Sequence, residues 1–202
     1  MKLYFFPGAC SLSPHIVASE AGIDLQLENV DLQTHKTAGG EDFYAVNPKG
    51  YVPALRLDDG SVLTEGPAIV QYLADQKPAS KLAPANGTVE RYRLQEWLNF
   101  ISTEVHKPMG SMFNPAIKPE QREAAIKQLG GRFDYLVKAL TGKTWLMGET
   151  FTAADAYLYT ILNWANFVKV DMSKWPVLTQ YVGHVSARPG VQKALKAEGL
   201  IK

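Results

Sequence analysis

The 202-residue sequence predicts an α/β domain followed by an all-helical domain. Short apolar runs alternate with helix-like stretches near the N-terminus. In YVPALRLDDGSVLT, residues 51–64, an Asp-Gly turn joins two apolar runs, as in a β-hairpin. After residue 88 the strand signals nearly vanish and helical spacing takes over. We therefore expect an α/β domain at 1–78, a linker at 79–87 and a helical domain at 88–202.

The first two elements meet at the only cysteine of the chain. The apolar run KLYFF at 2–6 fits a buried strand that a Pro-Gly pair closes. Helical spacing then predicts a helix over 11–21 that ends at Gly22. Pro14 fits this helix only in the first turn, where a missing N–H removes no intrahelical bond. The helix should therefore start close to Cys10.

The rest of the first domain continues the alternation. A second strand is expected at 25–32, and a loop with a short helix at 35–44. The hairpin and a helix at 65–76, EGPAIVQYLADQ, complete the domain. The order β-α-β-(α)-β-β-α predicts a small α/β sandwich.

The helical domain opens with a long helix over 88–106 that Pro108 ends or kinks. A loop is expected at 109–118, and apolar spacing predicts a helix over 119–142. Two further helices are expected near the C-terminus, at 175–188 and from residue 189 onward.

The motif FTAAD marks the start of the helix between these segments. Thr152 is the expected N-cap and Asp155 the third helical residue, which makes a capping box with Asp in place of Glu. We assign both residues to helix stability and expect loss of the cap to cost about 0.5–2 kcal/mol.

Composition limits the partners and the compartment. A net charge of +1 without long blocks of one sign gives no electrostatic reason to bind nucleic acid or an anionic membrane. One cysteine allows no internal disulfide. The apolar run at residues 3–6 is shorter than the roughly 7–15 residues of a signal-peptide core, and no stretch approaches the roughly 18 of a membrane span. We expect a cytoplasmic protein.

Cys10 has two interpretations. Free cysteines are among the most buried residue types, so Cys10 could simply fill space. A thiol at a strand-to-helix turn also faces a helix N-terminus, which lowers thiol pKa values toward 7. The run CSLS has the Cys-x-x-Ser spacing of monothiol redox sites, although that spacing is also common by chance.

Two further motifs could bind a peptide-like ligand. A cis Val52–Pro53 bond would leave the backbone of Val52 free to pair with an extended peptide, although the motif by itself favours a trans bond. Glu65 and Gly66 open a helix whose free N–H groups suit a carboxylate, while the Glu65 side chain suits an ammonium group. The plainer interpretation is an acidic residue that complements the helix dipole.

The helix EWLNFISTEVHKP carries a polar stripe. At α-helical spacing, one face holds Asn99, Thr103, His106 and Lys107. Such a stripe either lines a polar cleft or is simply solvated, and the Thr103 hydroxyl could bond back to the Asn99 carbonyl.

The motifs together resemble one family along essentially the whole chain. Cys10 at the first turn, NPKGYVPAL, LTEGPAIVQYL, EWLNFISTEVHK and FTAADAYL are similar to the bacterial beta-class glutathione S-transferases. The resemblance implies the glutathione transferase fold, with a thioredoxin-like N-terminal domain and an all-α C-terminal domain. It also implies a homodimer, with glutathione as co-substrate and no metal.

The resemblance also assigns roles to residues. Cys10 and His106 would be catalytic, with Cys10 beside the glutathione sulfur and able to form a mixed disulfide with it. Val52, ahead of cis-Pro53, would pair with the cysteinyl backbone of glutathione. The remaining glutathione contacts would come from a larger set: His35, Glu65, Gly66, Asn99, Thr103, His106 and Lys107. Met109, Met112 and Phe113 would form an apolar wall for the electrophile, although they could equally be ordinary helix packing.

The sequence departs from the family pattern at two positions. His35 stands where members often have a lysine that contacts the glycyl end, so this contact is expected to be weaker or pH-dependent. Lys36 is a possible substitute. Gly66 stands where other classes often have serine, so a hydroxyl hydrogen bond is missing.

The implied activity is conjugation of the glutathione thiolate to hydrophobic electrophiles, with dehalogenation as one form of it. The helix N-terminus and a cationic His106–Lys107 pair would stabilise the thiolate without a protein base. The alternatives are a thiol transferase or peroxidase that acts through a Cys10 mixed disulfide, and a non-catalytic ligand-binding protein on the same fold.

Overall fold

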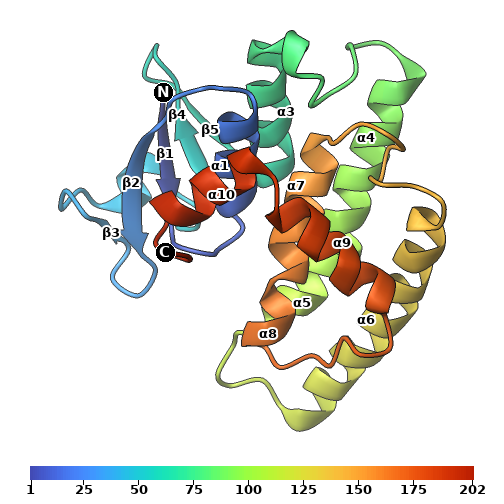
Figure 1. Ribbon diagram of the computed structural model, residues 1–202. Helices are drawn as coiled ribbons and strands as arrows, with labels where there is room; N and C mark the ends of the chain where they lie inside the picture. Colours follow the sequence, from blue (N-terminus) through green and yellow to red (C-terminus); the bar gives the residue numbers. More distant parts are fainter. The chain divides into compact units, whose positions relative to one another are not determined.

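The computed structural model describes residues 1–202. It divides into two compact units (Figure 1). The sheet unit comprises Met1–Ala83 and Arg188–Lys202, and the helical unit comprises Pro84–Ala187. None of the helices combines the length and the apolar character that a membrane span requires.

The sheet unit contains five strands in the order β3-β2-β1-β4-β5. Strand β1 pairs in parallel with β2 and antiparallel with β4, while β2–β3 and β4–β5 are antiparallel. The strands are β1 (Lys2–Phe5), β2 (Gln26–Asp31), β3 (Lys36–Thr37), β4 (Ala54–Arg56) and β5 (Val62–Thr64). The predicted strands and hairpin are confirmed. The two-residue β3 was not expected, because so short a strand has no readable periodicity.

The helices of the sheet unit are α1 (Leu12–Glu20), α2 (Phe43–Val46), α3 (Gly66–Gln76) and α10 (Pro189–Ala197), with a 3₁₀ turn η1 at Pro78–Ser80. The start of α1 directly after Ser11 confirms the placement inferred from Pro14. Helix α1 is buried from Leu12 to Ala18 because α3 and α10 both pack against it.

Helix α10 belongs to the sheet unit although it lies at the far end of the sequence. It runs beside α1 (Figure 1) and is tied to it by an ion pair and a hydrogen bond. Arg188 Nη2 lies 2.6 Å from Glu20 Oε2, and His15 Nδ1 lies 2.8 Å from Glu198 Oε1. The second Glu198 oxygen accepts the Gly8 N–H at 2.9 Å, in the loop before Cys10. The last residues therefore pack with the sheet unit, whereas the sequence suggested one helical domain to residue 202.

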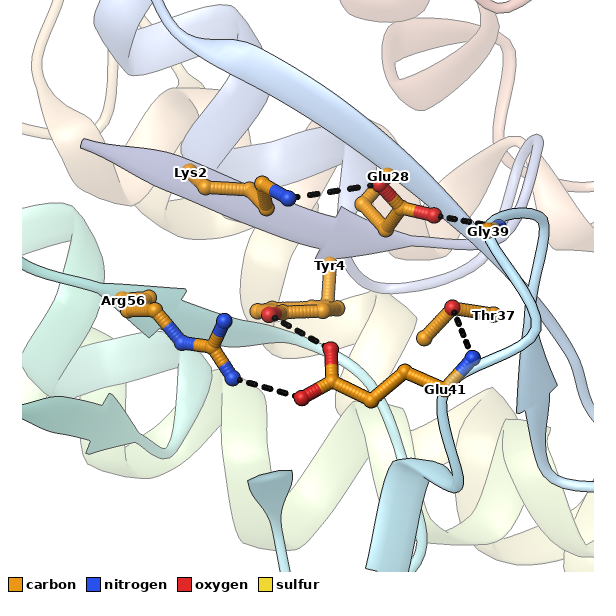
Figure 2. A network of polar contacts seen from close by, with 7 residues as sticks. All are labelled: Lys2, Tyr4, Glu28, Thr37, Gly39, Glu41 and Arg56. Carbon is orange, nitrogen blue, oxygen red and sulfur yellow. Dashed lines mark hydrogen bonds and ion pairs between the residues drawn. The ribbon is translucent and has the colours of Figure 1, made fainter. Parts of the chain in front are cut away.

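Polar contacts fasten the segment between β3 and α2 to the sheet (Figure 2). Glu41 accepts a hydrogen bond from Arg56 Nη2 at 3.0 Å and one from the Tyr4 hydroxyl at 3.4 Å. Glu28 accepts the Gly39 N–H at 2.9 Å, which holds the pKa of this carboxyl below its usual value. Helix α2 is thereby fixed over Tyr4, whose ring contacts Phe43.

The helical unit contains α4 (Val89–Phe100), α5 (Lys107–Ser111), α6 (Pro119–Leu140), α7 (Ala153–Leu162), α8 (Trp164–Phe167) and α9 (Pro176–Ser186). Helix α7 is buried along its whole length and forms the centre of the unit. A turn of π-helix, η2 (Ile101–His106), joins α4 directly to α5. The helix was predicted to end or kink at Pro108. It does not end there, and the irregularity is the π-turn just before the proline, whose ring clashes with a regular α-helical turn.

Candidate active site

Cys10 lies in the loop between β1 and α1, and serine side chains hold this loop. The Ser11 hydroxyl bonds both the N–H and the carbonyl of Phe6, each at 3.2 Å. The Ser13 hydroxyl donates to the Cys10 carbonyl at 2.8 Å. The serine of the CSLS motif therefore braces the backbone and does not serve as a partner for the thiol.

The Cys10 thiol is half-buried and protonated. It donates to the Val52 carbonyl, with Sγ 3.3 Å from the oxygen. Burial raises the pKa of Cys10 to about 12, although the backbone N–H groups of Cys10 and Ser11 act to lower it. The prediction of a lowered thiol pKa is wrong, because desolvation outweighs the helix N-terminus.

The Val52–Pro53 peptide bond is cis, as the family resemblance implied and contrary to the motif taken alone. Val52 belongs to a buried apolar cluster with Tyr4, Phe43 and Ala54 among its members. Its carbonyl faces Cys10, and its N–H forms no hydrogen bond within the chain. Val52 can therefore offer a backbone donor to an extended ligand beside the thiol.

Glu65 and Gly66 lie at the start of α3, next to Pro53. Glu65 has φ +70° and ψ 114°, a strained backbone for a residue with a side chain. The Glu65 carbonyl accepts the N–H groups of Ala68 and Ile69, and Pro67 has no N–H. The helix therefore presents one free donor, the Gly66 N–H, where the sequence suggested several. A Cβ on Gly66 would lie 3.9 Å from Pro53 Cγ, so this donor is close to the cis bond.

Lys49 is a site residue that the residue-by-residue reasoning missed. Its Nζ lies 2.5 Å from Glu65 Oε1 and 2.8 Å from Thr64 Oγ1. The Glu65 hydrogen bond raises the pKa of Lys49. The only available signal was its place in NPKGYVPAL, since a surface lysine has no distinctive spacing. An ammonium group that binds Glu65 must compete with Lys49.

His35 contacts Tyr44 and Phe43. Its ring packs against Tyr44 with centroids 4.6 Å apart, and its buried Nδ1 has no hydrogen-bond partner. Its carbonyl accepts the Phe43 N–H at 2.8 Å, which ties it to α2. Lys36 is exposed on β3. A direct role of His35 in ligand binding stays a prediction.

The polar stripe of the helical unit is divided by the π-turn. Asn99, Thr103 and Lys107 are exposed, whereas His106 is half-buried. The Lys107 N–H bonds the Ser102 carbonyl five residues back, so α-helical spacing does not apply across 101–106. The Thr103 hydroxyl donates to the Asn99 carbonyl at 3.2 Å, as the plainer interpretation expected.

Two of the four stripe residues line an open groove in the helical unit. It has a volume of about 450 Å³ and is lined on one side by Thr103, Lys107, Pro108 and Ser111. Helix α6 supplies the other side through Gln121, Ala124, Ala125 and Gln128. The lining does not include Asn99 or His106, so the stripe does not act as one surface.

His106 is uncharged at neutral pH. Burial, and then the positive charge of Lys107, lower the pKa of His106 to about 4. Its Nδ1 lies 2.6 Å from the Tyr157 hydroxyl. The expected cationic His106–Lys107 pair is therefore wrong, since His106 can contribute only as a neutral hydrogen-bonding group.

The predicted electrophile wall is mostly core. Met109 and Met112 are buried, while Phe113 is exposed and packs edge-on against Trp164. For the two methionines the structure favours ordinary helix packing. Phe113 alone of the three presents a large apolar surface.

Comparison with known proteins identifies the family. Residues 8–76 match the glutathione S-transferase N-terminal domain model, and residues 100–189 match the C-terminal domain model. Glutathione S-transferase GstA of Escherichia coli O157:H7 is 46% identical over 99% of this chain and 100% of its own length.

Solved structures agree. The Sphingomonad glutathione S-transferase complexed with glutathione is 49% identical, with a TM-score of 0.95 and full coverage of both chains. The bacterial beta-class glutathione S-transferase of Sphingomonas chungbukensis is 47% identical, with a TM-score of 0.96 and full coverage of both chains. These matches confirm the predicted fold class and enzyme class. The chain belongs to the glutathione S-transferase family and, within it, to the bacterial beta class.

Proposed function

We propose that this enzyme conjugates the thiolate of glutathione to hydrophobic electrophiles. The observation that carries the proposal is the arrangement in the sheet unit. Two free backbone donors, the N–H groups of Val52 and Gly66, accompany the Cys10 thiol and the Glu65 carboxylate around one cis-proline turn. Glutathione offers a matching carbonyl, carboxylate, sulfur and ammonium group. A relative with 49% identity was solved with glutathione bound.

Each group of the ligand has a proposed partner. The γ-glutamyl carboxylate would accept the Gly66 N–H, and its ammonium group would pair with Glu65. The cysteinyl carbonyl would accept the Val52 N–H, which places the ligand sulfur toward Cys10. His35 is retained for the glycyl end, and Asn99, Thr103, His106 and Lys107 are retained as glutathione contacts, on the strength of the family resemblance.

The chemical step needs a thiolate on glutathione and no charge on Cys10. A protonated Cys10 can turn its S–H from the Val52 carbonyl toward the ligand sulfur and so stabilise S⁻. The sulfur lone pair attacks the electrophilic carbon, a C–S bond forms, and a leaving group such as halide departs with the bonding electrons. The thiol proton is lost to solvent beforehand.

A homodimer in the cytoplasm is the proposed working state. An aromatic group on α4 and α6 supports self-association: Trp97, Phe100 and Tyr135 meet in edge-on and tilted contacts with centroids 5.1–5.9 Å apart. Tyr135 is 50% exposed, and Tyr92, on α4, is 62% exposed. Exposed aromatic surface of this kind is typical of protein interfaces.

Turnover with glutathione across aryl halides, epoxides, hydroperoxides and mixed disulfides tests the activity, and Glu65→Gln tests the site. We expect conjugation of aryl halides or epoxides. Because Gln keeps the shape but loses the charge, the KM for glutathione should rise about 10–100-fold in the variant. Glu149→Gln, an exposed loop position, is the matched control and should leave the KM unchanged. Equal KM values for the wild type and Glu65→Gln would remove Glu65 from the proposed site.

Gly66→Ser should tighten glutathione binding. The new Cβ fits, because the nearest atom outside the adjoining backbone, Pro53 Cγ, is 3.9 Å away. The added hydroxyl can donate to the γ-glutamyl carboxylate beside the Gly66 N–H, which should lower the KM for glutathione about tenfold. Gly66→Ala adds the same Cβ without a donor and serves as the control. If serine and alanine give the same KM, the carboxylate does not lie at this helix start.

A further inference from the structure

The His106 ring lies in a group of aromatic side chains from three other segments of the helical unit. Tyr157 on α7 and Trp164 on α8 meet the imidazole edge-on, with centroids 5.7 and 4.9 Å away. Phe113, after α5, packs edge-on against Trp164, with centroids 5.2 Å apart. Gly110 lies beside both rings, since a Cβ built there would be 3.8 Å from His106 Cδ2 and 3.7 Å from Trp164 Cζ3. The two edge-on contacts restrict the orientation of the imidazole.

Within this group the Nδ1 atom makes a short hydrogen bond. The Tyr157 hydroxyl oxygen lies 2.6 Å from His106 Nδ1, and Tyr157 is itself 2% exposed. No hydrogen bond within the chain occupies Nε2, and His106 is only half-buried. One ring nitrogen therefore faces the interior and the other remains available to a ligand.

The acidities of the two groups decide which of them donates. A phenol hydroxyl is a stronger hydrogen-bond donor than a neutral imidazole N–H, and the imidazole nitrogen is a stronger base than a phenol oxygen. A short contact between them is therefore best described as O–H···N. When Nδ1 accepts a hydrogen bond from the Tyr157 hydroxyl, the single N–H of a neutral imidazole must be on Nε2.

We propose that Tyr157 is a positioning residue that fixes His106 as the Nε2–H tautomer, with this N–H available to a bound anion. His106 then cannot accept a proton at Nε2, and its contribution is a directed neutral hydrogen bond. The catalytic consequence rests on the proposed function, in which His106 contacts glutathione. A hydrogen bond from the Nε2–H of His106 to the glutathione thiolate would stabilise S⁻ without any proton transfer.

Nitrogen-15 NMR of the imidazole rings tests the tautomer without any substrate. The chain has four histidines, and His106→Asn identifies the His106 signals by their loss. At pH 7 the wild type should show a pyrrole-type Nε2 and a pyridine-type Nδ1. Tyr157→Phe should bring the two shifts closer together as the Nδ1–H form becomes populated. A wild-type spectrum with the proton on Nδ1, or one that Tyr157→Phe leaves unchanged, would overturn the inference.

Steady-state kinetics then tests the consequence. Tyr157→Phe should lower kcat for conjugation about tenfold with little change in the KM for glutathione, and it should have no further effect in a His106→Ala background. Tyr159→Phe is the matched control, because Tyr159 is equally buried on the same helix and its hydroxyl contacts Ser186 instead. Failure of the proposed function would appear separately, as unchanged turnover in His106→Ala while the NMR result stands.

Discussion

Replacing Asp155 with alanine is expected to lower the free energy of unfolding by about 4 kcal/mol, well beyond the cost of losing a simple helix cap. The carboxylate is fully buried and accepts four hydrogen bonds. The donors are Leu146 N at 2.8 Å, Thr152 N at 2.8 Å, Thr152 Oγ1 at 2.9 Å and the Tyr181 hydroxyl at 2.9 Å. Alanine leaves all four donors without this acceptor, inside the core of the helical unit.

Urea unfolding of three variants tests whether the network of four hydrogen bonds to Asp155 stabilises the protein by more than a helix cap does. Burial and the Asp155 charge raise the pKa of Tyr181 well above its usual value, so its hydroxyl stays a donor. Tyr181→Phe removes this one donor and should cost about 1 kcal/mol. Asp171→Ala removes an exposed carboxylate that accepts a local bond from Ser173 N, and should cost less than about 1 kcal/mol. If Asp155→Ala lowers the free energy of unfolding no more than Asp171→Ala does, the hydrogen-bond network contributes little to stability.

The helix cap and the wider hydrogen-bond network differ in how far the sequence can predict them. FTAAD predicts the reciprocal contact of Thr152 and Asp155, because both residues belong to one helical turn. Leu146 and Tyr181 come from segments whose approach is decided by tertiary packing. The hairpin was predictable for the same local reason, since Asp59-Gly60 specifies its own turn.

Other features of the site carry no local signal. The π-turn at 101–106 changes the direction of every side chain after it, yet the sequence there has ordinary α-helical spacing. The positions of Thr103 and His106 on different surfaces could therefore not be predicted. The pKa of Cys10 likewise depends on burial beneath the completed fold, whereas its place at a helix start was visible in the sequence.

The thiol of Cys10 is expected to be the group that distinguishes conjugation from redox exchange. In Cys10→Ala, thiol–disulfide exchange should vanish, because no other sulfur in the chain can form the mixed disulfide: Cys10 is the only cysteine. Conjugation should persist within about tenfold in Cys10→Ala and more fully in Cys10→Ser, because a serine hydroxyl can still donate to the glutathione thiolate.

Alkylation by iodoacetamide measures the protonation state directly. With a pKa of about 12, only about one Cys10 in 10⁵ is a thiolate at pH 7, so the labelling rate should be low. The rate should rise about tenfold per pH unit from pH 7 to pH 10 without levelling off, since the thiolate is the reactive form. Cys10→Ala, which has no thiol, gives the background.

These two measurements decide the role of Cys10 together. A labelling rate that levels off near pH 8 would show a thiolate stabilised by the helix N-terminus, and Cys10 would then be suited to attack a disulfide itself. Complete loss of conjugation in both Cys10 variants, with glutathione still bound, would show that the thiol takes part in the conjugation step. Slow labelling together with surviving conjugation would leave glutathione's own sulfur as the nucleophile and Cys10 as its hydrogen-bond donor.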